Sequence, residues 1–302
     1  MKFGQVADPG GINFKLPKDP AATTELLSKA KGKGFEVSVG CAKWNKTDLK
    51  GFYPKGVKDE LEYYAGQFNS IELNATFYNM PTADQVIKWK EKTPKGFKFF
   101  PKLTNSISHV KRLTPDSLPV AETFCNAIAN FEEKLGMAFL QLHDKFSPKE
   151  FEKLTNFIEH FPKGIPLAVE VRNENWFADP LHWSAFCDLL QKKKMANIIV
   201  DTAGRRDMVH MRLTSPEAFI RFVGCNDDAI DKKRLDDWLK RIKKWQEEGL
   251  KKLYFFVHQN VELSSPLLSA YFIEKLNKIL DLNLHIPQMP DNDKGKGQGK
   301  LF

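Results

Sequence analysis

The chain has 302 residues, 42% of them apolar, so it can bury a large core in one big α/β barrel or in two ordinary domains. It carries 46 Lys and Arg against 38 Asp and Glu, a net charge of +8, which mildly favours an anionic partner such as phosphate or nucleic acid; a solubilising surface accounts for most of these lysines more simply. The four cysteines lack CxxC spacing, which argues against a zinc knuckle and a disulfide scaffold. Without a signal peptide or a long apolar run, the sequence predicts a cytoplasmic protein with no membrane segment.

The elements begin after an N-terminal arm, residues 1–34, which holds one short helix. Strand patterns then recur about every thirty residues, with apolar helical stripes between most of them. The predicted strands are 35–41, 70–74, 97–102, 137–142, 167–172, 196–201, 218–223 and 253–258. The helix after the sixth strand is missing or reduced, because the segment TAGRRDMVHMRLTSP has no clear period.

This alternation of eight strands with helices predicts a (β/α)8 TIM barrel in a single domain, residues 35–284, followed by a disordered tail, 285–302. A doubly wound open sheet is the main alternative. Such a sheet usually carries a Gly-rich phosphate loop after its first strand, whereas Gly40 is followed here by CAKWNK.

Polar residues end most of the predicted strands. Glu72 and Asn74 share one face of the second strand, and the outer face of a helix-covered parallel sheet must be apolar, so both should point inward at the carboxyl end. The same reasoning applies to the other strands. The last inward positions are predicted to be Cys41, Glu72 with Asn74, Lys102, Gln141, Glu170 with Arg172, Asp201, Arg221 and His258.

Several chemistries suit such a ring. Lys, Arg and acidic groups at one barrel mouth either pair with one another or serve a ligand, and three acids beside three bases favour a ligand site. The catalytic candidates are Glu72, Lys102, Glu170 and Asp201, with Arg172 and Arg221 joining Lys102 in holding a phosphate or carboxylate. The acids could instead hold a divalent metal together with His258, so the metal stays unknown. In the loops above the mouth, the substrate-binding candidates are Trp44, Tyr78 and Trp176, by stacking on a base or sugar, and His109.

The motifs GCAKWNK, GFYPKG, ELNATFY, FKFFPK, ISHVKRL, FLQL, AVEVRNENWF, IIVDTAGRR and AFIRFVG follow one another in an order that resembles the YecE-like family, also called domain of unknown function 72. The resemblance covers about residues 35–280 and implies a TIM barrel without an established reaction. The residues that fall on the family's motif positions are Glu72, Asn74, Tyr78, Lys102, His109, Gln141, Glu170, Arg172, Trp176, Asp201 and Arg221.

The chain departs from that pattern after its last strand. Many relatives read Asn-Asn there, whereas this chain reads Val257-His258-Gln259-Asn260, which puts any role of His258 in doubt. It also lacks the dense His and Asp set of a trinuclear zinc nuclease, so zinc is not favoured.

The tail ends in Gln298-Gly299-Lys300-Leu301-Phe302, which resembles the Gln-x-x-Leu-Phe peptide that docks bacterial repair and replication proteins on the sliding clamp. In the alternative, Leu301 and Phe302 fold back onto the barrel.

Three functions therefore follow from the sequence. The first is a hydrolase or lyase, phosphodiesterase- or nuclease-like, for a phosphate-containing substrate that includes nucleic acid among its candidates. The alternatives are a non-catalytic DNA-maintenance accessory protein recruited by the tail, and a sugar isomerase or epimerase with a divalent metal.

Overall fold

We describe the protein from a computed structural model, in which residues 3–32 and 34–290 are described. The predicted tail residues Gln298, Leu301 and Phe302 lie outside these ranges. Eight strands alternate with helices along the chain. The strands are β1 (Glu36–Cys41), β2 (Ser70–Leu73), β3 (Lys98–Pro101), β4 (Ala138–Gln141), β5 (Leu167–Glu170), β6 (Ala196–Asp201), β7 (Glu217–Gly224) and β8 (Lys252–Gln259).

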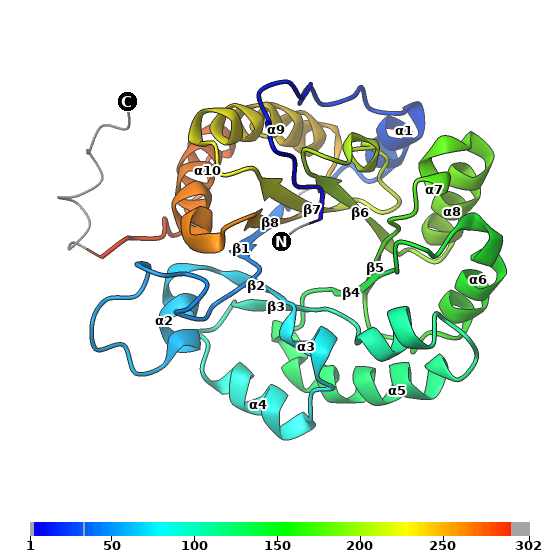
Figure 1. The fold of residues 1–302 in the computed structure, drawn as a ribbon, viewed down its shortest axis with the longest axis horizontal. Coiled ribbons are helices and arrows are strands. Elements are labelled where there is room, and N and C mark those ends of the chain that lie inside the picture. Colours follow the sequence, from blue (N-terminus) through cyan, green and yellow to red (C-terminus); the bar gives the residue numbers. More distant parts are fainter. Residues whose placement is uncertain (1–2, 33, 291–302) are drawn as a thin grey trace.

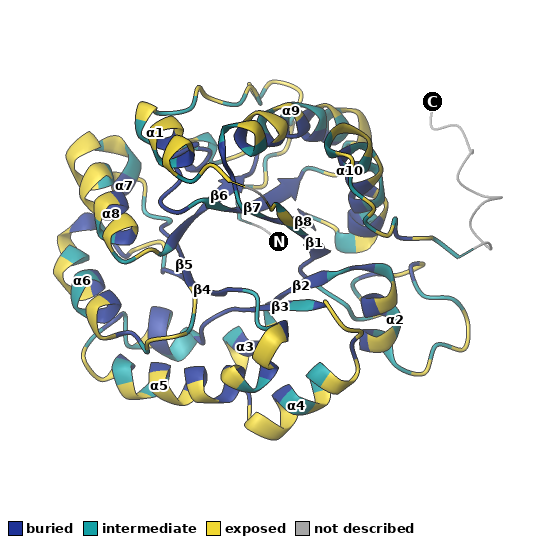
Figure 2. Cartoon of the chain, turned by 180° about the vertical axis from the view of Figure 1, so that it is seen from behind, coloured by how far each residue is buried: buried dark blue, intermediate teal, exposed yellow. Residues whose placement is uncertain are grey.

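The longer helices lie outside the strands and bury one face each, as Figure 2 shows by their dark blue inner and yellow outer sides. Three of them follow an aspartate whose side chain accepts backbone N–H groups: Asp59 before α2, Asp179 before α8 and Asp227 before α9. The α-helices are α1 (Ala21–Lys29), α2 (Glu60–Gln67), α3 (Ala75–Tyr78), α4 (Ala83–Glu91), α5 (Ser117–Ile128), α6 (Phe151–His160), α7 (Asn175–Ala178), α8 (Pro180–Lys192), α9 (Asp228–Glu248) and α10 (Ser265–Leu280).

The strands lie around a common centre with the helices outside them (Figure 1). Six strands form one parallel sheet in the order β1-β8-β7-β6-β5-β4, while β2 and β3 pair separately, also in parallel. Two isolated parallel bridges, Phe99 with Leu135 and Lys102 with Phe139, link β3 to the segment that holds β4. The fold is thus α/β with a six-stranded parallel half-barrel sheet, and the predicted eight-stranded barrel is confirmed to that extent.

Two apolar cores lie on the two sides of the strands. The outer core separates strands from helices and is lined by residues such as Val39, Ile199 and Val257. The inner core fills the space enclosed by the strands and consists of Phe100, Met137, Phe139, Ala168, Ala196, Ile198, Val200, Met208, Phe219, Val223, Tyr254 and Phe256. Large aromatic rings fill this interior, so it is packed and is not a channel.

The two cores show which residues of β1 and β6 point inward. They contradict the prediction from the sequence at two positions, Cys41 and Asp201. Cys41 belongs to the outer core, where its Sγ lies 3.7 Å from Ser269 Oγ of α10, so the predicted inward position is wrong. In β6, Val200 belongs to the inner core, so the next residue, Asp201, points outward.

The N-terminal segment crosses the ends of the strands toward their centre (Figure 1). The amide of Gly204, just after β6, donates to the carbonyl of Gly4 over 2.7 Å. Between β6 and β7 the described chain forms only a short 3-10 helix, Arg206–Met208, where the sequence predicted a missing or reduced helix. No described helix is both long and apolar enough for a membrane span. The predicted limits of arm, barrel and tail stay predictions.

Candidate functional site

Arg221 of β7 is the centre of a buried ion network at the carboxyl ends of the strands. Its Nε and Nη2 donate to the two carboxylate oxygens of Glu72 over 2.9 and 2.8 Å, a bidentate pair across the ring from β7 to β2. Its Nη1 donates to Glu170 Oε2 over 2.6 Å and to Gln141 Oε1 over 3.3 Å. The guanidinium lies 5.6 Å from the ring of Phe139, so the network sits directly on the inner core. One arginine thereby joins four strands.

Two further side chains hold Glu72. His258 of β8 places Nε2 2.9 Å from Glu72 Oε2, and Asn74 donates from Nδ2 to Glu72 Oε1 over 2.8 Å. His258 Nδ1 lies 3.9 Å from Glu262, which follows β8. Glu72 is therefore fully buried and bonded on both oxygens, and its carboxylate plane is fixed.

Both glutamates stay ionised in this network. Burial alone raises the pKa of Glu72, but Arg221 and His258 outweigh it and hold the pKa well below the ordinary value. Burial likewise acts against the charge of Glu170, and Arg221 and Arg172 together lower its pKa to about 2. Neither carboxyl group is suited to exchange a proton near pH 7.

Lys102, one residue after β3, carries a buried amine at the edge of this network. The residue is 6% exposed, and its ammonium donates to Gln141 Oε1 over 3.0 Å and lies 4.0 Å from the centre of the Phe77 ring. Burial, followed by the charges of Arg221 and Arg172, lowers the pKa of Lys102 to about 7. At pH 7 roughly half of the molecules therefore carry a neutral amine here.

Arg172 flanks the network on the β5 side. Its Nε donates to Glu170 Oε1 over 2.6 Å, and its guanidinium lies 3.9 Å from the ring of Phe3. Its buried Nη2 has no hydrogen-bond partner among the described residues. Arg172 therefore has a hydrogen-bond donor beside the network, Nη2, that no described residue uses.

An open cavity of about 460 Å³ adjoins the network on the side of β1, β2, β3 and β8. Tyr78 is 71% exposed on its rim. The lining residues are Ala42, Lys43, Thr47, Asp48, Asn74, Tyr78, Lys102, His258, Asn260, Val261 and Glu262. The cavity is large enough for a small substrate, and Lys102 is part of its wall.

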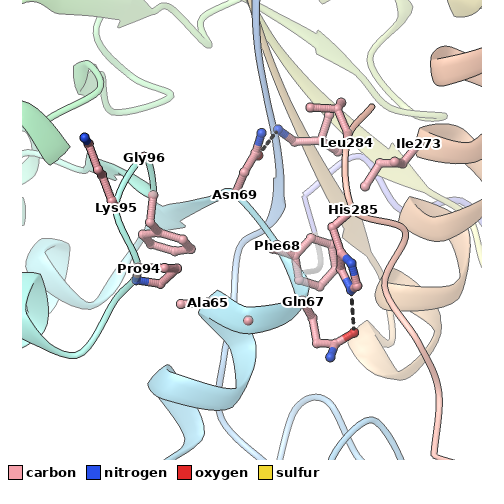
Figure 3. Close-up of a pocket in the computed structure, with 13 residues that line it drawn as sticks. Ala65, Gln67, Phe68, Asn69, Pro94, Lys95, Gly96, Ile273, Leu284 and His285 are labelled. Atoms are coloured by element: carbon pink, nitrogen blue, oxygen red, sulfur yellow. Dashed lines mark hydrogen bonds between the residues drawn. The ribbon is translucent and has the colours of Figure 1, made fainter. Parts of the chain in front are cut away.

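Figure 3 shows a different pocket, of about 280 Å³, whose lining segments precede β2 and β3. It therefore lies at the amino-terminal ends of these strands, away from the ion network. Its walls include Phe68, Ile273 and Leu284, and His285 Nε2 lies 3.3 Å from Gln67 Oε1. None of the ionisable strand-end residues lines it, so it offers no comparable chemistry.

The structure separates Asp201 from the site. Its carboxylate accepts from Trp238 Nε1 over 2.7 Å and forms an ion pair with Arg234 Nη2 at 2.9 Å, both on α9, and it also pairs with Arg206. Burial raises its pKa, but Arg234 and Arg206 outweigh burial and lower it. The predicted place of Asp201 at the barrel mouth is wrong, because its partners lie on the helix side of β6.

We expect the Asp201→Ala variant to lose about 3 kcal/mol of the free energy of unfolding, because Arg234 would keep its buried charge with one carboxylate fewer. Urea unfolding at pH 7 measures this. The matched control is Asp207→Ala, which removes a partly exposed carboxylate paired with Arg205 and should cost below about 1 kcal/mol. If Asp201→Ala instead kept the stability of the parent and lost ligand binding, Asp201 would be a binding residue and not a structural one.

The aromatic residues predicted in the loops above the mouth occupy different environments. Trp176 is fully buried and donates from Nε1 to the Phe146 carbonyl over 2.9 Å, so its predicted position above the mouth is wrong. Trp44 packs edge-on against Trp89 with ring centres 5.8 Å apart and does not line the cavity, although Tyr78 does.

His109 lies beside the site without lining the cavity. Its Nδ1 is 2.8 Å from Ser108 Oγ, and its ring centre is 4.9 Å from that of Phe77. Burial is the main cause that lowers the pKa of His109 to about 4, so the ring is neutral at pH 7.

Sequence reasoning missed Phe77, Glu262 and Phe3. Phe77 follows Asn74 by three residues on the short helix α3, a spacing that returns a side chain toward the same end of β2. Phe3 lies in the arm and carried no signal, since nothing local connects it with Arg172. Within residues 3–32 and 34–290, no group of three or more His, Cys, Asp or Glu is arranged to hold a metal ion.

Comparison with known proteins places this chain in a family. Residues 38–292 match the family model described as protein of unknown function DUF72. The chain is 28% identical over 275 residues to the UPF0759 protein YecE of Escherichia coli K12, which covers 84% of this chain and 97% of that protein. It is also 28% identical over 154 residues to the UPF0759 protein YunF of Bacillus subtilis 168, covering 48% of this chain and 54% of that one.

Two solved structures share the fold. A DUF72 family protein of Enterococcus faecalis V583 superposes with a TM-score of 0.63 at 18% identity, covering 82% of this chain and 99% of that one. A DUF72 family protein of Thermotoga maritima MSB8 gives 0.61 at 24% identity, covering 82% and 100%. The family match spans most of the chain and agrees with these likenesses, and the protein therefore belongs to the DUF72 family.

Proposed function

We propose that this protein is an enzyme, a lyase or hydrolase, that binds a small phosphate- or carboxylate-bearing substrate in the cavity beside the ion network. In this proposal the eight strands work as a (β/α)8 barrel with its site at the carboxyl ends, where such barrels carry their chemistry. The observation that carries it is the buried amine of Lys102, which has a pKa of about 7 and opens onto a cavity of about 460 Å³.

The charges of the network favour an anionic substrate. Among the groups joined to Arg221 and Gln141, two carboxylates, Glu72 and Glu170, face two guanidinium groups and the ammonium of Lys102, which leaves these five groups with one positive charge in excess while Lys102 is protonated. An anion would neutralise that excess in a site shielded from water. It could also use the donor that Arg172 Nη2 keeps without a partner among the described residues.

The roles follow from the pKa values. Lys102 is the catalytic residue. Its neutral amine accepts a proton from the substrate or from a water molecule that attacks the substrate, and the resulting ammonium returns a proton later in the reaction. Gln141 fixes its Nζ, and Phe77 covers it. Glu72 and Glu170 are too acidic to exchange protons near pH 7, so they act as fixed charges that position Arg221 and Arg172.

The test begins with competitive acetylation by acetic anhydride at pH 5 to 11, followed by mass spectrometry of the peptide that contains Lys102. We expect half-maximal labelling near pH 7, and protection when inorganic phosphate or pyrophosphate is added. Half-maximal labelling near 10.4, the ordinary value for lysine, without protection would refute the proposal.

Turnover is then screened on sugar phosphates, phosphomonoesters and short oligonucleotides. Lys102→Met and Lys102→Arg should both reduce it by about 10²- to 10⁴-fold, since an arginine side chain does not give up its proton. Lys163→Met, at an exposed lysine before β5, is the matched control and should leave the rate unchanged. The nucleic-acid, sliding-clamp and sugar-isomerase alternatives stay predictions.

A further inference from the structure

The N-terminal arm places an aromatic ring on the ion network. The ring of Phe3 lies 3.9 Å from the guanidinium carbon of Arg172 and 5.9 Å from that of Arg205, and it packs against the inner core. At 3.9 Å, a ring face covers a guanidinium from water and holds its plane. The Phe3 ring therefore covers the guanidinium of Arg172.

The arm is held in this place by its backbone. The Gly4 carbonyl accepts from the Gly204 amide over 2.7 Å and from Thr202 Oγ1 over 3.2 Å. Gly4 has φ +70°, and a Cβ there would overlap the Thr202 side chain, while a Cβ on Gly204 would lie 2.9 Å from the Gly4 carbonyl oxygen. Glycine is needed on both sides of the contact, so these two segments are fitted to each other.

A second anchor lies ten residues further along the arm. The ring of Phe14 is 4.6 Å from the guanidinium of Arg234, and the Phe14 carbonyl accepts from Arg206 Nη2 over 3.3 Å. Both anchors lie on the side of β6 and α9. The open cavity lies on the other side, along β1, β2, β3 and β8, so the arm and the cavity divide the ends of the strands between them.

We propose that Phe3 is a specificity-determining residue, which closes the Arg172 side of the site so that it takes a small anion and refuses a polynucleotide. This inference rests on the function proposed above. A polyanion that followed Arg172 and Lys102 across the strand ends would have to cross the arm. A small phosphate enters from the cavity, which Lys102 lines, without crossing the arm, and it gains from the water that Phe3 excludes around Arg172.

Phenylglyoxal modification of arginine, followed by mass spectrometry, tests directly whether Phe3 covers Arg172. We expect Arg172 to be modified at least about 10-fold faster in Phe3→Ala than in the parent protein, because covered guanidinium groups are out of reach of the reagent. Gly4→Val should give the same result by displacing the arm. Gln5→Ala, at an exposed residue of the same arm, is the control and should match the parent.

Binding of two probes tests the specificity. The parent should bind pyrophosphate in calorimetry and show no saturable binding of a 12-nucleotide single-stranded DNA. Phe3→Ala should bind pyrophosphate about 3- to 30-fold more weakly, the range expected for losing one aromatic–guanidinium contact. Equal Arg172 reactivity in all four proteins, or DNA binding to the parent as tight as pyrophosphate binding, would overturn the inference.

These results separate the two proposals. If Phe3 shields Arg172 but Lys102 is acetylated as an ordinary lysine, the enzyme proposal fails, while the covering of Arg172 by Phe3 is confirmed. If Lys102 reacts near pH 7 and Arg172 is equally reactive with and without Phe3, the enzyme proposal stands and the role of the arm falls.

Discussion

Arg221→Met is expected to be the most damaging single change in this protein, with a loss of about 3 to 5 kcal/mol in the free energy of unfolding at pH 7. Arg221 is fully buried and pairs with two fully buried carboxylates, Glu72 and Glu170. Methionine fills much of the same volume, so the cost comes from leaving two charges without their shared partner. Urea unfolding followed by circular dichroism measures it.

The pH dependence identifies this cause. In the parent, the pKa values of both carboxyls are lowered, so their contribution to stability is present above the unfolded value of about 4.5 and is lost as the pH falls toward about 2. In Arg221→Met, the lowering by Arg221 is lost, so both pKa values move upward, against the remaining effect of His258 on Glu72 and of Arg172 on Glu170. The difference in stability between parent and variant should therefore be largest near pH 7 and shrink as the pH falls through 4.5.

Arg221→Lys is the matched control, because it keeps the charge and loses the bidentate geometry with Glu72. It should recover part of the loss. A cost below about 1 kcal/mol for Arg221→Met, as for an exposed pair, would show that this network does not support the fold.

The sequence revealed this network through strand ends whose polar residues break an apolar pattern. Glu72 follows Ile71 and precedes Leu73 in β2, and Arg221 lies between Ile220 and Phe222 in β7. A charge in such a context has to be buried, and the carboxyl ends of parallel strands meet at one end of the sheet. Local pattern plus topology was therefore sufficient to bring these residues together.

The same reasoning failed for Asp201 and Cys41 because both faces of their strands are buried. β6 has apolar residues on its inner face, such as Ile198, and on its outer face, such as Ile199, so the two-residue period gives no contrast. What decides the direction of Asp201 is Trp238, which lies 37 positions along the chain on α9. A partner at that distance leaves no trace in the local pattern.

Lys102→Met is expected to stabilise the fold in spite of removing the proposed catalytic residue. Burial lowers the pKa of Lys102 from 10.5 to about 7, so between these values the unfolded chain binds a proton that the folded chain releases. Stability of the parent therefore rises with pH over this window, and below about pH 7 the full cost of the buried charge is present. A span of that size corresponds to at most about 5 kcal/mol.

Part of this gain is offset by contacts that methionine does not replace. The variant loses the hydrogen bond to Gln141 and the position of the ammonium against Phe77, each of which is worth about 1 kcal/mol. We therefore expect a net stabilisation of about 2 to 3 kcal/mol at pH 6 that fades as the pH approaches 10.5. Urea unfolding at pH 6, 8 and 10 measures both the size and the trend.

The trend decides what Lys102 is for. Lys163→Met, at an exposed lysine, should change stability little at any of these pH values. If Lys102→Met is instead less stable than the parent at pH 6, the ammonium is a structural partner of Gln141 and of the glutamates. If it is more stable, the chain keeps a buried charge that weakens its fold, as expected of a residue that serves the site and not the fold.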